Sequence, residues 1–123
     1  MPTGSIRTDT AEPGVCPYFH AAIELIGMRW NGLILQLLAE RPLRYADVKA
    51  HIREVSPTML SQRLRELEAA RLLVREVEPG PPVHVRYRLT EAGDALQPIL
   101  RAITAWGHDW LPATGAAQPD VHR

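Results

Sequence analysis

The chain has 123 residues, enough for one domain, and its 46% hydrophobic and 23% charged residues are typical of a globular protein rather than a disordered one. Fourteen basic and fourteen acidic residues give a net charge of zero, which argues against a nucleic-acid partner because such proteins usually carry a basic excess. A single cysteine excludes a disulfide within the chain.

The charges are unevenly distributed along the chain. Residues 1–40 and residues 91–123 each carry two basic and four acidic residues, so each segment is net −2. Residues 41–90 hold ten basic and six acidic residues and are net +4. Thirteen of the fourteen basic residues are arginine, whose planar guanidinium suits bidentate contacts to phosphates and base edges. The neutral total therefore conceals a basic central block.

We expect residues 1–15 and 112–123 to be flexible tails and residues 16–111 to form the folded unit. The first segment is rich in proline, glycine, serine and threonine, and the last has too few apolar residues to pack. The N-terminus lacks the apolar run of a signal peptide, and the densest hydrophobic run, residues 32–39, is far shorter than the ~18–20 residues that cross a bilayer. A cytoplasmic protein without a membrane partner is expected.

Three helices are predicted in the first half of the folded unit. Pro17 suits the first turn of a helix over residues 17–28, because the N–H that proline lacks would be unpaired there. Residues 31–40 are apolar nearly all round, as in a short buried helix, and Arg41-Pro42 ends that helix. A shorter helix is predicted over residues 45–51.

The next helix, from Ser56 to about Ala70, has the most informative sequence. Ser56-Pro57 combines an N-cap residue with a first-turn proline. At about 100° per residue, the apolar and polar side chains fall on opposite arcs, with Leu60, Leu64 and Leu67 on one and Thr58, Gln62 and Arg65, with Ser61 at the edge, on the other. One face therefore packs, and the other is available for hydrogen bonds.

After residue 71 the hydrophobic period changes from about 3.6 residues to 2. Residues 72–78 are predicted to form one strand. Residues 83–89 form a second, in which apolar and basic side chains alternate, with Val83, Val85, Tyr87 and Leu89 on one face and His84, Arg86 and Arg88 on the other. The prolines between the strands make a stiff turn. The pattern predicts a β-hairpin with a basic outer face.

A last helix is predicted from Thr90-Glu91 to about Leu111. Pro98 removes one backbone hydrogen bond, so we expect a bend near residues 94–98. The helix carries an apolar stripe too long for one small core to cover, formed by Leu96, Ile99, Leu100, Ile103, Trp106 and Trp110.

A pair of helices followed by a hairpin is typical of a winged helix-turn-helix, in which the second helix of the pair enters the major groove of DNA. We therefore predict a mainly α-helical fold with a small β-hairpin, in which the helix over 56–70 reads double-stranded DNA. The predicted DNA-binding residues are Ser56, Pro57, Thr58, Met59, Ser61, Gln62, Arg63, Arg65, His84, Arg86 and Arg88.

The chemistry of these side chains supports that prediction. Gln62 can pair with adenine edges, and Arg65 with guanine or phosphate. The backbone N–H groups of Thr58 and Met59, expected to be free in the first turn, can bind a phosphate. The alternative is that both polar faces are merely solvated.

Three stretches in this order resemble the HxlR family of bacterial transcriptional regulators, a branch of the MarR-like winged-helix group: CPYFHAAIELIGMRWNGLILQLL, SPTMLSQRLRELEAARLLVRE and YRLTEAGDALQPILRAITAW. The resemblance covers about residues 16–110. It implies a homodimer in which the first and last helices act as flanking dimerisation helices across a two-fold axis. Two recognition helices would then enter successive major grooves of a pseudo-palindromic operator.

Two positions depart from the family pattern. Relatives often have arginine just after the paired prolines of the wing, where this chain has His84, and a basic residue after Ser-Pro, where this chain has Thr58. Both changes predict weaker attraction to phosphate.

Several relatives use a cysteine at the start of the first helix as a thiol switch, and Cys16 matches that position. A helix N-terminus stabilises a thiolate, so Cys16 is a candidate sensor through a bridge between subunits or a mixed adduct. The alternative is that Cys16 packs beside Pro17 and senses nothing. Aromatic and methionine residues are candidates for an effector pocket or, alternatively, for the core: Tyr18, Met28, Trp30, Trp106 and Trp110.

The leading hypothesis is a dimeric, sequence-specific DNA-binding regulator of transcription, with repression as the favoured action and an oxidant or small molecule as a candidate effector. The alternative is a winged-helix protein-interaction module without DNA binding. An enzyme is not expected, because the chain shows no nucleophile with a base at a motif spacing and no glycine-rich phosphate loop. Neither a cofactor nor a metal is expected, since the five histidines lack ligand spacing.

Overall fold

The computed structural model describes residues 16–112, and the predicted tails lie almost wholly outside that range. Within it the fold is mainly α-helical with a small antiparallel sheet. The elements in chain order are α1 (Pro17–Gly27), α2 (Asn31–Glu40), β2 (Leu43–Arg44), α3 (Tyr45–His51), α4 (Pro57–Ala69), β3 (Leu73–Glu78), β4 (His84–Leu89), α5 (Glu91–Ala95) and α6 (Gln97–Trp110).

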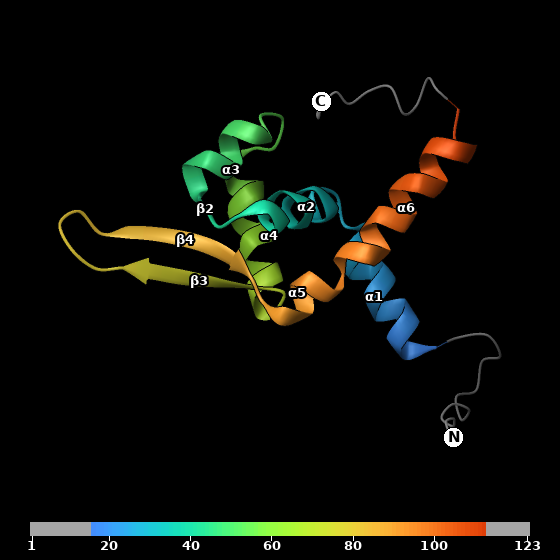
Figure 1. The fold of residues 1–123 in the computed structure, drawn as a ribbon, viewed down its shortest axis with the longest axis horizontal. Coiled ribbons are helices and arrows are strands. Elements are labelled where there is room, and N and C mark those ends of the chain that lie inside the picture. Colours follow the sequence, from blue (N-terminus) through green and yellow to red (C-terminus); the bar gives the residue numbers. More distant parts are fainter. Residues whose placement is uncertain (1–15, 113–123) are drawn as a thin grey trace.

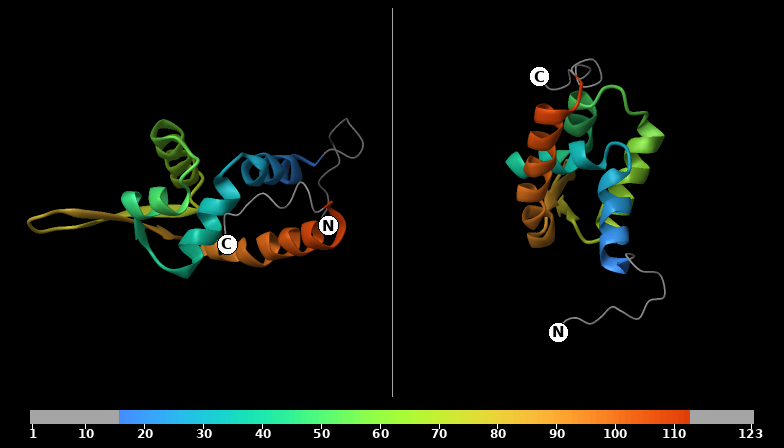
Figure 2. Two further views of the ribbon diagram at one scale, coloured as in Figure 1. Left: turned by 90° about the horizontal axis from the view of Figure 1, so that it is seen from above. Right: turned by 90° about the vertical axis from the view of Figure 1, so that its right-hand side faces the viewer.

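The elements are arranged around a central group of helices. Figure 1 shows the hairpin of β3 and β4 extending from one end of the molecule, α1 and α6 extending from the other, and α2, α3 and α4 between them. Seen from above, α4 projects from one side of the molecule, and α6 lies on the other side and extends away from the hairpin (Figure 2). The helix pair α3 and α4 followed by a hairpin confirms the predicted winged helix-turn-helix.

The core is built from one face of each central helix. Leu60, Leu64 and Leu67 of α4 are almost completely buried, as their spacing predicts. They belong to one cluster with Ile34 and Leu35 of α2. Burial of these apolar side chains is the main source of stability, since isolated helices of this length are marginal in water.

The sheet has three strands rather than the two of the predicted hairpin, in the order β2-β4-β3. The added strand, β2, pairs antiparallel with β4 through Leu43 opposite Tyr87 and Arg44 opposite Arg86. Two residues are too few to show an alternating pattern in the sequence. The strand is fixed by the buried side chain of Leu43, which anchors the chain between α2 and α3.

The predicted last helix is divided into two. α5 ends at Ala95 and α6 begins at Gln97, with Leu96 between them, so the change occurs within the region where a bend was expected. Pro98 lies in the first turn of α6, a position that does not require a backbone N–H. The helix therefore restarts at the proline instead of bending through it.

The start of α5 is packed tightly against the connection between α4 and β3. Thr90 caps α5 by accepting a hydrogen bond from the N–H of Gly93 (3.2 Å), and its hydroxyl donates to the carbonyl of Arg71 (2.7 Å). The backbone N–H of Thr90 also donates to the carbonyl of Leu72 (3.0 Å). Gly93 is buried at this junction, where a Cβ would overlap the carbonyl oxygen of Leu72. Glycine is thus required at position 93 because there is no room for a side chain.

Replacing Gly93 should destabilise the whole domain. In Gly93→Ala the new methyl group meets backbone that cannot move without breaking the bond between Thr90 and Leu72, so we expect a loss of at least about 2 kcal/mol in the free energy of unfolding. Urea unfolding measures it. Gly32→Ala is the control because its Cβ meets nothing within 4 Å, and an equal loss in both variants would contradict the packing argument.

Candidate nucleic-acid interface

The outer face of α4 is the polar surface that the sequence predicts. Thr58, Gln62 and Arg65 are exposed on it, and Ser61 is half-buried at its edge. The opposite leucine face lies in the core, so this helix cannot rotate without exposing three leucines. The polar side chains are consequently presented to solvent in a fixed orientation.

The first turn of α4 is held by two hydrogen bonds. The hydroxyl of Ser56 accepts from the N–H of Met59 (3.1 Å), as expected of an N-cap. The hydroxyl of Tyr45, at the start of α3, donates to the carbonyl of Pro57 (3.1 Å). This second bond ties the two helices of the pair together at their N-terminal ends.

The same cap corrects one detail of the sequence-based prediction. The N–H of Met59 was expected to be free for a phosphate, but Ser56 already occupies it. Pro57 has no N–H to offer. The N–H of Thr58 is therefore the first-turn donor to which that prediction still applies.

Arg63 is placed differently from its predicted neighbours. It is only 8% exposed, and its guanidinium donates to the carboxylate of Glu66. The reason is its spacing, three residues after Leu60 and four before Leu67, which puts Arg63 on the packing side of the helix. This burial argues against a DNA contact by Arg63, and the spacing of the leucines could have indicated it.

Glu66 links the buried and the exposed sides of α4. One carboxylate oxygen accepts from Arg63, and the other accepts from the amide of Gln62 (3.2 Å). The hydrogen bond from Arg63, followed by that from Gln62, lowers the pKa of Glu66 below its ordinary value of 4.5 despite some desolvation. An ionised Glu66 therefore orients the amide of Gln62. The oxygen of this amide and one of its N–H groups are left for another partner. The spacing of residues in the sequence alone does not show this role of Glu66.

The basic outer face of the hairpin is partly neutralised. Arg88 forms an ion pair with Glu76 (2.8 Å), and Arg86 lies 3.8 Å from Glu78. The register of β3 and β4 places both glutamates on the same face as the arginines. The prediction of a basic face considered only the second strand and overlooked the acidic residues that alternate on the first. His84 is also engaged, because Arg44 donates to its Nδ1 (2.8 Å).

The two outer helices leave large apolar side chains uncovered. On α6, Ile99, Ile103, Trp106 and Trp110 are exposed, the last to 73%, which confirms that the single domain does not cover the stripe. Leu100, from the same predicted stripe, is buried instead. On α1, Tyr18 and Phe19 are exposed as well. Such a large apolar surface on two helices is typical of an interaction site.

The candidate sensor and effector residues are not gathered in one place. Cys16 is exposed at the N-cap position of α1. Tyr18 and Trp106 are exposed on different helices, whereas Trp30 packs partly against the core, with the guanidinium of Arg29 at 4.5 Å from its ring. Trp30 adopts a left-handed backbone conformation, φ 81°, where the chain turns from α1 into α2.

Over residues 16–112, no helix combines the length and apolar character needed to span a bilayer. The same residues contain no cluster of three or more histidine, cysteine or carboxylate side chains able to hold a metal ion.

A winged helix-turn-helix whose second helix presents a polar face to solvent is typical of the class of helix-turn-helix transcriptional regulators. Residues 25–115 match the family model described as HxlR-like helix-turn-helix. The chain is 42% identical over 92 residues to the HTH-type transcriptional regulator YodB of Bacillus subtilis (strain 168), covering 75% of this chain and 82% of that protein. The chain belongs to the HxlR-like helix-turn-helix family.

Solved structures agree with this assignment. The reduced form of YodB from B. subtilis superposes with a TM-score of 0.74 at 40% identity, over 79% of this chain and 95% of that chain. The redox regulator HypR in its oxidized form gives a TM-score of 0.72 at 31% identity, over 79% of this chain and 99% of that chain. YodB has also been solved in a quinone-bound form, with a TM-score of 0.70 at 38% identity, over 78% of this chain and all of that chain.

The bond between Arg63 and Glu66 should make stability depend on pH. The lowered pKa of Glu66 means that its ionised form stabilises the folded state above pH ~4.5, and that this contribution is lost as pH falls through the lower folded-state value. Glu66→Gln should therefore lower the free energy of unfolding at pH 7 by about 1 kcal/mol, a modest value because the carboxylate is 35% exposed.

Urea unfolding at pH 7 and pH 3 tests this expectation, with Glu68→Gln as a control on the exposed side of α4. The difference between Glu66→Gln and the unmodified protein should shrink at the lower pH. A difference that is absent at pH 7, or equal in both variants, would show that the carboxylate of Glu66 does not stabilise the fold.

Proposed function

We propose that the protein is a homodimeric, sequence-specific DNA-binding regulator that represses transcription and whose DNA affinity changes when Cys16 is modified. The observation that carries the DNA-binding part is the outer face of α4, where Thr58, Gln62 and Arg65 project from a helix whose other face is fixed in the core. Such a regulator acts in the cytoplasm on double-stranded DNA.

The contacts follow from the side chains on this face. Gln62, with its amide oriented by Glu66, would pair with an adenine edge, and Arg65 with guanine or phosphate. The N–H and hydroxyl of Thr58 would approach the DNA backbone, and Ser61 would lie at the edge of the contact. The wing would add a weaker contact through His84, Arg86 and Arg88, because its arginines already face glutamates.

The dimer follows from the exposed apolar faces of α1 and α6. Trp106 and Trp110 on α6, and Tyr18 on α1, would be buried when these helices meet the same helices of a second copy across a two-fold axis. The two copies of α4 would then face the same side of the duplex. Their spacing should match one turn of DNA, about 34 Å, and the operator should be pseudo-palindromic.

DNA binding can be tested by fluorescence anisotropy with the DNA that flanks the gene. We expect saturable binding whose affinity falls ~10³-fold between 50 and 200 mM salt if about six phosphates are contacted by the dimer. Gln62→Ala and Arg65→Ala should each weaken specific binding by about 10- to 100-fold, the value of a base-specific contact.

Arg75→Ala, an exposed arginine on β3, removes the same charge outside this face and should have little effect. A dimer without measurable DNA affinity at low salt would contradict this function and favour a protein-interaction module. Affinity that responds equally to all three substitutions would show that the contact is not specific.

The response of Cys16 is supported by its exposure at the start of α1 and by the relatives. YodB has been solved in quinone-bound and diamide-treated forms, and HypR is described as a redox regulator in its oxidized form. In this chain the thiolate of Cys16 would add to the ring of a quinone. Diamide would instead oxidise two Cys16 thiols to a disulfide between subunits, and is itself reduced to the hydrazine.

We therefore expect diamide or a benzoquinone to change DNA affinity by at least about tenfold in the unmodified protein and to leave Cys16→Ser unaffected. Anisotropy measures affinity, and mass spectrometry identifies the adduct or the bridge. Modification of Cys16 without any change in affinity would disprove the switch, and an equal response in Cys16→Ser would assign it to another group.

A further inference from the structure

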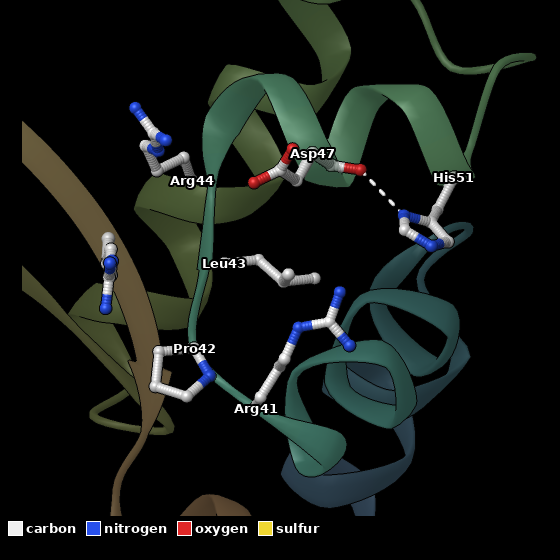
Figure 3. A pocket seen from close by; sticks show the side chains of 7 residues that line it. Arg41, Pro42, Leu43, Arg44, Asp47 and His51 are labelled. Atoms are coloured by element: carbon white, nitrogen blue, oxygen red, sulfur yellow. Dashed lines mark hydrogen bonds between the residues drawn. The ribbon is translucent and has the colours of Figure 1, made fainter.

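A cleft of about 290 Å³ lies where α2, β2, α3 and β4 meet (Figure 3). Its charged lining consists of Arg41, Arg44, Arg86, Asp47 and His51. No residue of α4 or of the turn between β3 and β4 contributes to it. The cleft is therefore separate from the polar face of α4.

The fold brings Arg86 beside Arg41 and Arg44, which lie three residues apart in the sequence. β2 and β4 pair so that Arg44 lies directly opposite Arg86. Two like charges at opposed positions of an antiparallel pair destabilise the sheet unless something compensates them. Arg41, at the end of α2, adds a third cation, and Figure 3 shows its side chain extending toward α3 beside Leu43.

The charges of this cleft are not balanced from within. Arg44 donates to a neutral acceptor, the Nδ1 of His84, and Arg86 is 3.8 Å from the nearest carboxylate oxygen of Glu78. Within residues 16–112, neither Arg41 nor Asp47 takes part in an ion pair shorter than 4.0 Å. The lining carries three guanidinium groups and one carboxylate, net +2, and Glu78, which pairs with Arg86 from outside the lining, reduces this to +1.

His51 is held at the margin of the cleft. Its Nδ1 lies 2.8 Å from the carbonyl oxygen of Asp47, so that nitrogen carries the proton and donates. The Nε2 atom is left for another partner.

We propose that this cleft binds the phosphate group of a small phosphorylated compound. A tetrahedral phosphate offers three free oxygens, which matches the three arginines that line the cleft, whereas a carboxylate offers only two oxygens. The volume is at the lower limit for small-molecule sites, which fits a compact ligand. The bound anion would connect the end of α2, the start of α3 and strand β4, and so join the helix pair to the wing.

Calorimetric titration with inorganic phosphate, in phosphate-free buffer at constant ionic strength, tests the proposal. We expect one saturable site per chain in the unmodified protein. Arg41→Ala and Arg44→Ala should each raise the Kd by about tenfold or more, since each removes a charge-assisted hydrogen-bond donor. Arg75→Ala is the matched control, because it removes an arginine outside the cleft and should leave the Kd unchanged.

Asp47→Asn is expected to increase phosphate affinity, a change that a poorly folded variant would not show. The substitution removes the only carboxylate of the lining, so phosphate should bind more tightly, by several-fold. Circular dichroism of each variant verifies the fold. Absence of saturable phosphate binding, an equal loss in Arg75→Ala, or an Asp47→Asn variant that binds phosphate more weakly would each overturn the proposal.

DNA is the other source of phosphate, and Arg41→Ala distinguishes it. In phosphate-free buffer, Arg41→Ala should bind DNA like the unmodified protein if the cleft takes a free ligand. Arg44→Ala is unsuited to this comparison because Arg44 holds His84 of the wing. If Arg41→Ala instead loses DNA affinity as strongly as Arg65→Ala, and inorganic phosphate does not bind, the cleft contacts the DNA backbone and the proposal is wrong. Because phosphate binding is measured without DNA, its failure is distinguishable from a failure of the proposed DNA-binding function.

Discussion

The burial of three leucines on one face of α4 determines most of what this molecule presents to its surroundings. Leu60, Leu64 and Leu67 insert into the core, and because a helix is rigid about its own axis, the residues on its opposite side must face outward. Arg63, placed among the leucines, is forced inward and takes Glu66 as its partner. Glu66 then fixes Gln62. The packing of the leucines thus influences the orientation of Gln62 on the polar surface, through the hydrogen bonds that Glu66 accepts from Arg63 and from Gln62.

Most of the fold was predictable because its helices carry local signals. The bounds of α2 and α3 match the predicted ranges, and the start of α4 follows from Ser56 and Pro57, which act through the adjacent backbone alone. Features that depend on distant residues were not predictable in the same way. Strand β2 exists because Leu43 is buried against elements elsewhere in the chain, and its two residues show no period.

In the candidate site, too, features set by neighbouring residues could be predicted from the sequence, whereas features set by distant residues could not. Periodicity alone identified Thr58, Gln62 and Arg65 as the outer face of α4. The partial neutralisation of the hairpin required the pairing register of β3 and β4, because a single strand does not show which charges its neighbour places alongside. The arginine cleft likewise depends on Arg44 meeting Arg86, 42 positions later in the sequence. The basic central block therefore divides into the polar face of α4, a hairpin whose arginines face glutamates, and a cleft that shares Arg86 with that hairpin.

The glutamates of β3 have a second consequence. The order β2-β4-β3 leaves β3 at the edge of the sheet, with a row of backbone groups that a strand from another molecule could pair with. Arg75, Glu76 and Glu78 lie along that edge and are exposed. A second copy of the strand aligned against it would bring like charges together, so these residues protect an extended, two-sided hairpin from edge-to-edge aggregation. The glutamates that weaken the positive field of the wing toward DNA therefore also keep strand β3 from pairing with another molecule.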